Sequence, residues 1–158
     1  MATYRIEDIE GLRKTEFRAV VLLVSEGDEE VDAAETFESL DAKRERELRT
    51  RFEAWIDGVH HNNQWFHGFN REGYRECLVF KWTEKRLRYR LYGFLCHPLP
   101  RTNKRFQVCV LTNHAEKSQW ETDPSELNKA NSLRVDSYVQ AAIQMFFHDD
   151  APGTRCLN

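Results

Sequence analysis

Short apolar runs rich in β-branched and aromatic residues mark four predicted strands. The first, residues 16–25 (EFRAVVLLVS), is almost continuously apolar, which is typical of a strand buried on both faces. Three further runs follow in the middle of the chain, at 74–82, 86–96 and 106–114. Their composition and the short segments between them predict an antiparallel meander.

Between the first strand and this meander, apolar positions recur at three- and four-residue steps, the period of helices packed on a core. A highly charged stretch begins at Asp41, a residue type that caps helices. The segment therefore predicts two helices, over 29–39 and 42–57, paired as an antiparallel hairpin. Gly58 ends the second helix, because glycine commonly follows the last helical turn.

Near the C-terminus, the run Asp-Pro-Ser-Glu at 123–126 is typical of a helix start. Its aspartate can cap, its proline suits the first turn and its glutamate completes a capping box. Apolar positions continue from there and predict one helix over 123–147. The predicted order β-α-α-β-β-β-α is an α+β fold, a small antiparallel-dominated sheet packed on a helical hairpin and a C-terminal helix.

Composition indicates one globular domain. The chain has 158 residues, of which 41% are hydrophobic and 31% charged, so it resembles neither disordered nor membrane proteins. We expect an N-terminal extension at 1–15, a single domain at 16–147 and a flexible tail at 148–158. No apolar run approaches the roughly 20 residues of a membrane span, and the N-terminus lacks the apolar core of a signal peptide. We therefore expect a cytoplasmic protein with no membrane contact.

The chain lacks the motifs of cofactor and metal sites. Its four cysteines, at positions 77, 96, 109 and 156, form no CxxC pair, and we expect them to act as small hydrophobic residues. No Walker, Rossmann, HExxH or GxSxG motif is present. Residues 85–115 contain no carboxylate, which disfavours a two-metal nuclease. We therefore expect no metal and no small-molecule cofactor.

Charged residues are unevenly distributed along the chain, and this points to a binding function. The net charge of −3 hides the uneven distribution. Residues 1–57 carry nine basic and sixteen acidic side chains, residues 71–105 carry ten and three, and residues 106–158 carry four and seven. A basic block between acidic flanks is typical of a polyanion-binding surface. The alternative is that this block pairs with the acidic helical segment of the same chain.

The predicted strand 86–96 carries the most informative pattern. Because side chains alternate along a strand, four of its residues are predicted to share one face: Arg86, Arg88, Arg90 and Tyr92. Arginines spaced about 7 Å apart repel one another unless an anion lies among them. We therefore expect this face to be wet and to bind RNA phosphate, while the opposite face, with Leu91, packs on helices.

Further basic residues are expected at the same surface. Lys81 lies on the neighbouring predicted strand, and His114 and Lys117 lie at and just after the end of the last one. Lys104 and Arg105 lie in the connection that precedes the last strand. A histidine at a strand end is well placed to transfer protons near neutral pH. A hydrogen-bonded structural role for His114 is the alternative.

Three pieces of the chain resemble the RelE/HigB toxin superfamily of bacterial toxin–antitoxin systems. They are RYRLYGF at 88–94, VCVLTNHAEKSQ at 108–119 and TDPSELNKA at 122–130. In that family an arginine-bearing strand precedes an apolar strand, which ends in a basic stretch that leads into a helix. The charged helical hairpin upstream also suits the family's order. Trp120 and Glu121 depart from the family's basic run, so one expected lysine is missing.

The resemblance implies a ribosome-dependent mRNA endoribonuclease, with a cognate antitoxin protein, the ribosome and mRNA as partners. It implies that four residues are catalytic: Arg90, Lys81, His114 and Lys117. RNA would be bound by the arginine face and by the basic connection: Arg86, Arg88, Arg90, Tyr92, Lys104 and Arg105. Such cleavage needs cations that stabilise a phosphorane. Two alternatives stay open, a ParE-like gyrase inhibitor and an inactive relative that only binds RNA or protein.

Overall fold

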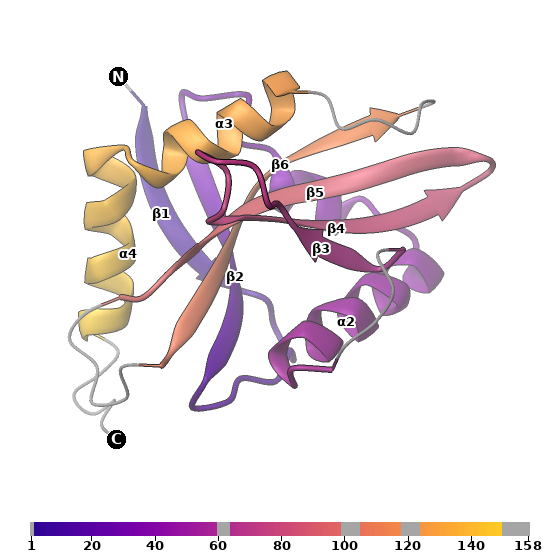
Figure 1. The fold of residues 1–158 in the computed structure, drawn as a ribbon, viewed down its shortest axis with the longest axis horizontal. Coiled ribbons are helices and arrows are strands. Elements are labelled where there is room, and N and C mark those ends of the chain that lie inside the picture. Colours follow the sequence, from indigo (N-terminus) through magenta and orange to yellow (C-terminus); the bar gives the residue numbers. More distant parts are fainter. Residues whose placement is uncertain (1, 60–63, 99–104, 118–123, 150–158) are drawn as a thin grey trace.

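In this computed structural model, which describes residues 2–59, 64–98, 105–117 and 124–149, the chain forms one six-stranded sheet with helices on both faces (Figure 1). The strands are β1 (Thr3–Asp8), β2 (Arg18–Glu26), β3 (Phe66–Gly68), β4 (Cys77–Glu84), β5 (Leu87–Cys96) and β6 (Gln107–Lys117). The helices are α1 (Ala33–Glu38), α2 (Ala42–Ile56), α3 (Pro124–Arg134) and α4 (Ser137–Asp149).

The strand order across the sheet is β1-β2-β6-β5-β4-β3. All neighbouring strands are antiparallel except β2 and β6, which pair in parallel. A parallel pair needs a crossover, and the chain between β2 and β6 supplies the two helices α1 and α2 as well as the meander. The predicted α+β class and its antiparallel-dominated sheet are confirmed.

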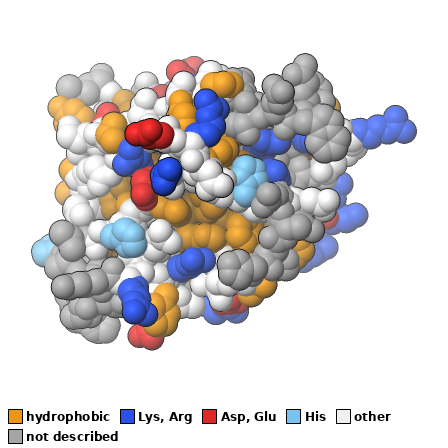
Figure 2. All heavy atoms as spheres, viewed as in Figure 1, with side chains coloured by type: hydrophobic (Ala, Val, Ile, Leu, Met, Phe, Trp, Pro, Cys, Tyr) orange, Lys and Arg blue, Asp and Glu red, His pale blue; other side chains and the backbone are white. Residues whose placement is uncertain are grey.

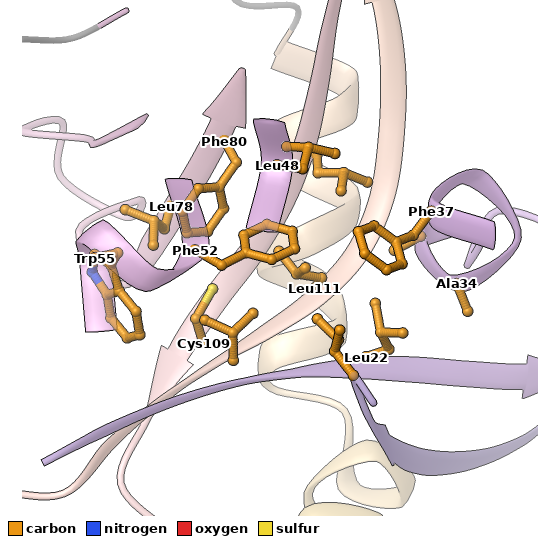
Figure 3. Packing of buried hydrophobic residues seen from close by; sticks show 14 of the residues in the cluster. Leu22, Ala34, Phe37, Leu48, Phe52, Trp55, Leu78, Phe80, Cys109 and Leu111 are labelled. Atoms are coloured by element: carbon orange, nitrogen blue, oxygen red, sulfur yellow. The ribbon is translucent and has the colours of Figure 1, made fainter. Parts of the chain in front are cut away.

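Helices cover both faces of the sheet, which therefore has two apolar surfaces. On one face, called the α2 face, Phe80, Leu91 and Leu111 pack under α1 and α2. Figure 3 shows Phe37 of α1 and Phe52 of α2 turned toward one another, and their ring centroids lie 5.9 Å apart. On the other, called the α3 face, the buried sheet residues pack under α3 and α4: Ile6, Val21, Val79, Tyr92, Phe94, Val110 and Ala115.

The two predicted helices of the first crossover are present, although α1 is shorter than expected. The carboxylate of Asp41 accepts a hydrogen bond from the Arg44 N–H at 2.8 Å, so Asp41 caps α2 as predicted. Gly58 follows this helix with a φ of +71°, a left-handed conformation that glycine adopts without strain.

Three elements differ from the prediction. Residues 3–8, expected to belong to an extension, form β1, which pairs with β2 along its whole length and buries Ile6. The short β3 was not predicted either. The single helix expected over 123–147 is two helices, because Asp136 interrupts it and its carboxylate caps α4 through the N–H groups of Tyr138 and Val139. Asp123 and the tail from residue 150 lie outside the described residues.

A β-bulge between β5 and β6 decides which side chains meet on each face. Gly93 pairs with Leu111 and Tyr92 pairs with Asn113, so Thr112 is an extra residue on β6. A Cβ on Gly93 would lie 2.5 Å from the Val110 carbonyl oxygen, and only glycine allows this close backbone approach. Because of the extra residue, every side chain of β6 after the bulge lies on the opposite face from the one that simple alternation predicts.

Candidate nucleic-acid interface

A cavity of about 470 Å³ lies where β4 and β5 extend past the short β3. Cationic, aromatic and neutral polar side chains line this basic pocket: Arg51, Gln64, Trp65, Lys81, Trp82, Thr83, Arg88, Tyr89 and Arg90. No carboxylate is among the described residues that line it. Lys and Arg side chains gather at the end of the molecule toward which the β4–β5 hairpin projects (Figure 2).

Strand register brings three of these cations together. Lys81 of β4 lies opposite Arg90 of β5, and Arg88 lies opposite Thr83, so all three residues are on the α3 face of two adjacent strands. The prediction that Lys81 and the arginines of the next strand share a surface agrees with this register. Convergent positive charge in a cleft is the arrangement that focuses a field on an anion.

A fourth cation, Arg51, comes from α2. Its guanidinium donates a hydrogen bond to the carbonyl oxygen of Lys81 and lies 5.4 Å from the centroid of the Trp65 ring. The Lys81 N–H donates in turn to the Trp65 carbonyl at 2.9 Å, which holds the indole beside the strand edge. The helix α2, on the other face of the sheet, thus contributes a cation to this pocket.

Burial, together with the cations of this pocket, alters the pKa values of Lys81 and His67. Burial, followed by the charges of Arg90 and Arg88, lowers the pKa of Lys81 from its usual 10.5. Burial also lowers the pKa of His67, and the charges of Lys81 and Arg90 add to the decrease, although a hydrogen bond to the Gly68 carbonyl opposes it. The lowered pKa values mean that both side chains lose a proton more readily than they would in water.

The expectation that the arginine face is open to water is wrong for Arg90 and Tyr92. Arg90 is only 5% exposed and Tyr92 is completely buried, in contact with the cluster that α3 covers. Side-chain alternation assigned them to the same face correctly, but it cannot show that a helix also covers that face. Arg88 is half-buried and lines the pocket.

The remaining predicted RNA-binding residues lie elsewhere. Arg86 is exposed and belongs to the β4–β5 turn rather than to β5. Arg105 is exposed just before β6, at the far end of that strand from the residue that pairs with Arg88. The Cα partner of Arg88 is Lys117, the last residue of β6. Lys104 lies outside the described residues.

His114 lies on the opposite face of the sheet from Lys81 and Arg90. Its Cα partner is Leu91, and the bulge after Leu111 is the reason that it joins the α2 face. Both its main-chain N–H and its Nδ1 lie 2.9 Å from carboxylate oxygens of Asp32, at the start of α1. The structure therefore does not place His114 with the other predicted catalytic residues, and its partner is a carboxylate.

Sequence reasoning missed three residues of this region, Arg51, Trp65 and His67. Arg51 is one of several cations on a highly charged helix, and nothing in the spacing indicates that it reaches β4. Trp65 and His67 belong to a segment with no apolar period. Their aromatic content beside a basic block is the one signal that favours a nucleic-acid site here.

Several classes of site are not seen in the part of the chain that the structure describes. There, no group of three His, Cys, Asp or Glu side chains is placed to hold a metal ion. Among the same residues, no helix has the length and apolar character needed to cross a bilayer. Cys77 and Cys109 are buried core residues, as expected, and burial raises the pKa of the Cys77 thiol to about 11.

Comparison of this chain with models of protein families, with curated proteins and with solved structures found no match.

Proposed function

We propose that the chain binds single-stranded RNA in the basic pocket. The observation that carries this proposal is the convergence of Arg51, Lys81, Arg88 and Arg90 on one cavity with aromatic walls. Phosphate contacts from cations supply most of the affinity of such sites. A base stacked on an aromatic side chain such as Trp65 adds about 1–3 kcal/mol.

We further propose that the bound RNA is cleaved without a metal, as the resemblance to the RelE/HigB superfamily implies. In this reaction the 2′-hydroxyl attacks the adjacent phosphorus, and the bond from phosphorus to the 5′-oxygen breaks. Arg88 and Arg90 would stabilise the added negative charge of the phosphorane. Lys81, whose pKa is lowered, would accept or supply a proton, and His67 takes the role that sequence reasoning had assigned to His114.

Binding is tested first, with a fluorescent RNA of about ten nucleotides, a length within the range of small single-strand sites. We expect an anisotropy increase that weakens steeply with salt, because binding releases counterions. Arg88→Ala should lower the affinity about tenfold, which corresponds to a loss of about 1.4 kcal/mol in phosphate contacts. Arg88 is chosen over Arg90 because truncation of the buried Arg90 would also remove packing.

The matched control is Arg105→Ala, which removes the same charge from an exposed position outside the pocket. It should leave the RNA affinity within about twofold of the parent protein. Thermal melts of both variants show whether either change alters the fold. If folded wild-type protein does not bind RNA at low salt, or if both variants lose affinity equally, the proposal is wrong.

The toxin interpretation is tested by expression in bacterial cells. Expression in bacteria should arrest growth, co-expression of a cognate antitoxin encoded next to the chain should relieve it, and primer extension should show cuts in translated mRNA. Lys81→Met keeps the length of the side chain without its charge and should abolish the cuts. If the cells grow normally while they contain a high level of folded protein, and their mRNA stays intact, the cleavage proposal is wrong.

A second candidate, RNA binding without catalysis, is favoured by the position of His114. His114 lies on the opposite face of the sheet from Lys81 and Arg90. Catalysis would therefore need His67 as the acid or base, whereas binding needs neither histidine. RNA binding by the purified protein together with intact mRNA on translating ribosomes would support this candidate. A DNA damage response without mRNA cuts would support the gyrase branch.

Another interpretation of the uneven charge is that the acidic N-terminal segment covers the basic block, and the position of β1 argues against it. β1 forms the sheet edge opposite to the one at which β4 and β3 lie. Residues 3–8 are therefore remote from the basic pocket, and they do not cover it.

A further inference from the structure

A second cavity, of about 590 Å³, lies on the α2 face between α1 and the end of the β4–β5 hairpin. This acidic pocket is lined by side chains from α1, the start of α2 and three strands: Asp32, Glu35, Thr36, Ser39, Leu40, Asp41, Trp82, Glu84, Tyr89 and His114. Four of the ten lining residues are carboxylates, and His114 is the one residue among them that can become a cation.

The carboxylates differ in how far they are already engaged. Asp32 bonds to His114, and Asp41 accepts the capping N–H of Arg44. Within the described residues, neither Glu35 nor Glu84 is in an ion pair. Two carboxylates that face a cavity without a counter-charge attract a cation of complementary shape.

An aromatic wall supplies a second and independent observation. The rings of Trp82 and Tyr89 are stacked, with centroids 5.2 Å apart and planes inclined by 16°. Trp82 is 2% exposed, and its indole Nε1 is a buried donor with no hydrogen-bond partner. Buried donors of this kind are rare in folded proteins. This one belongs to a residue of the cavity wall, so an acceptor that a ligand brings would reach it after a small shift of the ring.

We propose that the acidic pocket binds the guanidinium group of an arginine side chain on a partner polypeptide. A guanidinium is planar, stacks on aromatic rings and pairs with carboxylates in a fork, so it suits Tyr89, Glu35 and Glu84 together. A peptide carbonyl beside that arginine would accept the hydrogen bond that Trp82 Nε1 lacks. The site is thus an interaction site for a basic segment, and it does not depend on RNA binding in the basic pocket.

The test is an NMR titration of the full chain that follows the indole N–H signal of Trp82. The probe is N-acetyl-arginine-N-methylamide, which carries the guanidinium and two peptide carbonyls. We expect saturable binding in the millimolar range that suits a single side chain. Glu35→Gln and Glu84→Gln should each weaken it at least threefold.

The matched control is Glu38→Gln, which changes an exposed residue of the same helix outside the cavity and should bind as the wild type does. Butylguanidine has the same single charge on its guanidinium but no peptide carbonyl. Equal or tighter binding of butylguanidine would overturn the assignment to a polypeptide. No shift of the Trp82 signal, or equal binding by both pocket variants and wild type, would overturn the site, whatever RNA does in the basic pocket.

Discussion

Strand alternation predicts the sheet face of Arg90 correctly and that of His114 incorrectly. Alternation along β5 places Arg90 with Arg88 and opposite Lys81, and the register agrees. On β6, the same rule fails at His114, because Thr112 is an extra residue of the bulge. An offset of one residue exchanges the two faces of a strand. His114 was expected beside the basic pocket and instead lines the acidic pocket.

His114 also gives the chain a pH-dependent contribution to stability. The hydrogen bond to Asp32, reinforced by nearby carboxylates and opposed by burial, raises its pKa above 6.5 in the folded state. A raised pKa means that protonated His114 stabilises the fold. This contribution is fully present below the unfolded pKa and is lost as pH rises through the folded pKa.

The prediction concerns His114→Gln, compared with the wild type by urea unfolding at pH 5.5 and pH 9. The variant should be less stable at the lower pH by a few tenths to about 1 kcal/mol, the range of partly exposed ion pairs. At the higher pH the difference should shrink, because the neutral imidazole has no charge to pair with Asp32. A difference that grows with pH would mean that the assigned sign is wrong.

At the scale of elements, the β4–β5 hairpin ends in a two-residue turn that its sequence does not favour. Glu84 pairs with Leu87, and between them Lys85 and Arg86 have φ values of +51° and +71°. A two-residue turn with two positive φ values favours Asn-Gly, since other side chains are strained there. The turn therefore keeps two cations at the hairpin tip at the expense of stability.

Replacing both residues, Lys85→Asn with Arg86→Gly, should stabilise the protein by about 1 kcal/mol. The measurement is the urea midpoint at unchanged slope. Lys85→Asn alone should give a smaller gain, because it relieves one of the two positions. A lower midpoint for the double variant would show that these side chains stabilise the hairpin in some other way.

Much of the element pattern could be predicted because strong local signals agree with it. α2 has a helical apolar period, a capping aspartate and a terminal glycine, and its bounds are nearly as expected. β1 has no comparable apolar run, and only its pairing with β2 makes it a strand. The break at Asp136 interrupts a continuous apolar pattern, so the sequence favours one long helix there.

The basic pocket could be predicted in part for a related reason. Lys81, Arg88 and Arg90 come from neighbouring strands of a meander, whose register follows from a short hairpin. Arg51 and Trp65 reach the pocket through long-range packing, which no local pattern shows. The burial of Arg90 likewise depends on how the helices cover the sheet.

At the scale of the whole molecule, β1 closes one edge of the sheet. Without it, β2 would present an unpaired apolar strand to solvent, an arrangement that promotes aggregation. β1 also carries Ile6 to the α3 face, where it packs with Val21 and Leu23. The segment before residue 16 therefore belongs to the folded unit.

Deletion of residues 1–10 should destabilise the protein by at least about 3 kcal/mol, because it removes two buried isoleucines at about 1.5–3 kcal/mol each as well as the strand pairing. Light scattering during thermal unfolding should also reveal earlier aggregation. Ile6→Ser should reproduce part of the loss, whereas Arg5→Ser, at the neighbouring exposed position, should not. A truncated chain as stable as the full one would rule out this role for β1.

The stacked pair of Trp82 and Tyr89 lines both cavities, so the two proposed sites would be coupled through these rings. Any ligand that shifts these rings from one side changes the free energy of binding on the other. Such a coupling is reciprocal, so an arginine-bearing partner that weakened the proposed RNA binding would itself be weakened by RNA to the same degree. A partner protein could then control access to the phosphate site without touching it, through competition for the position of two rings.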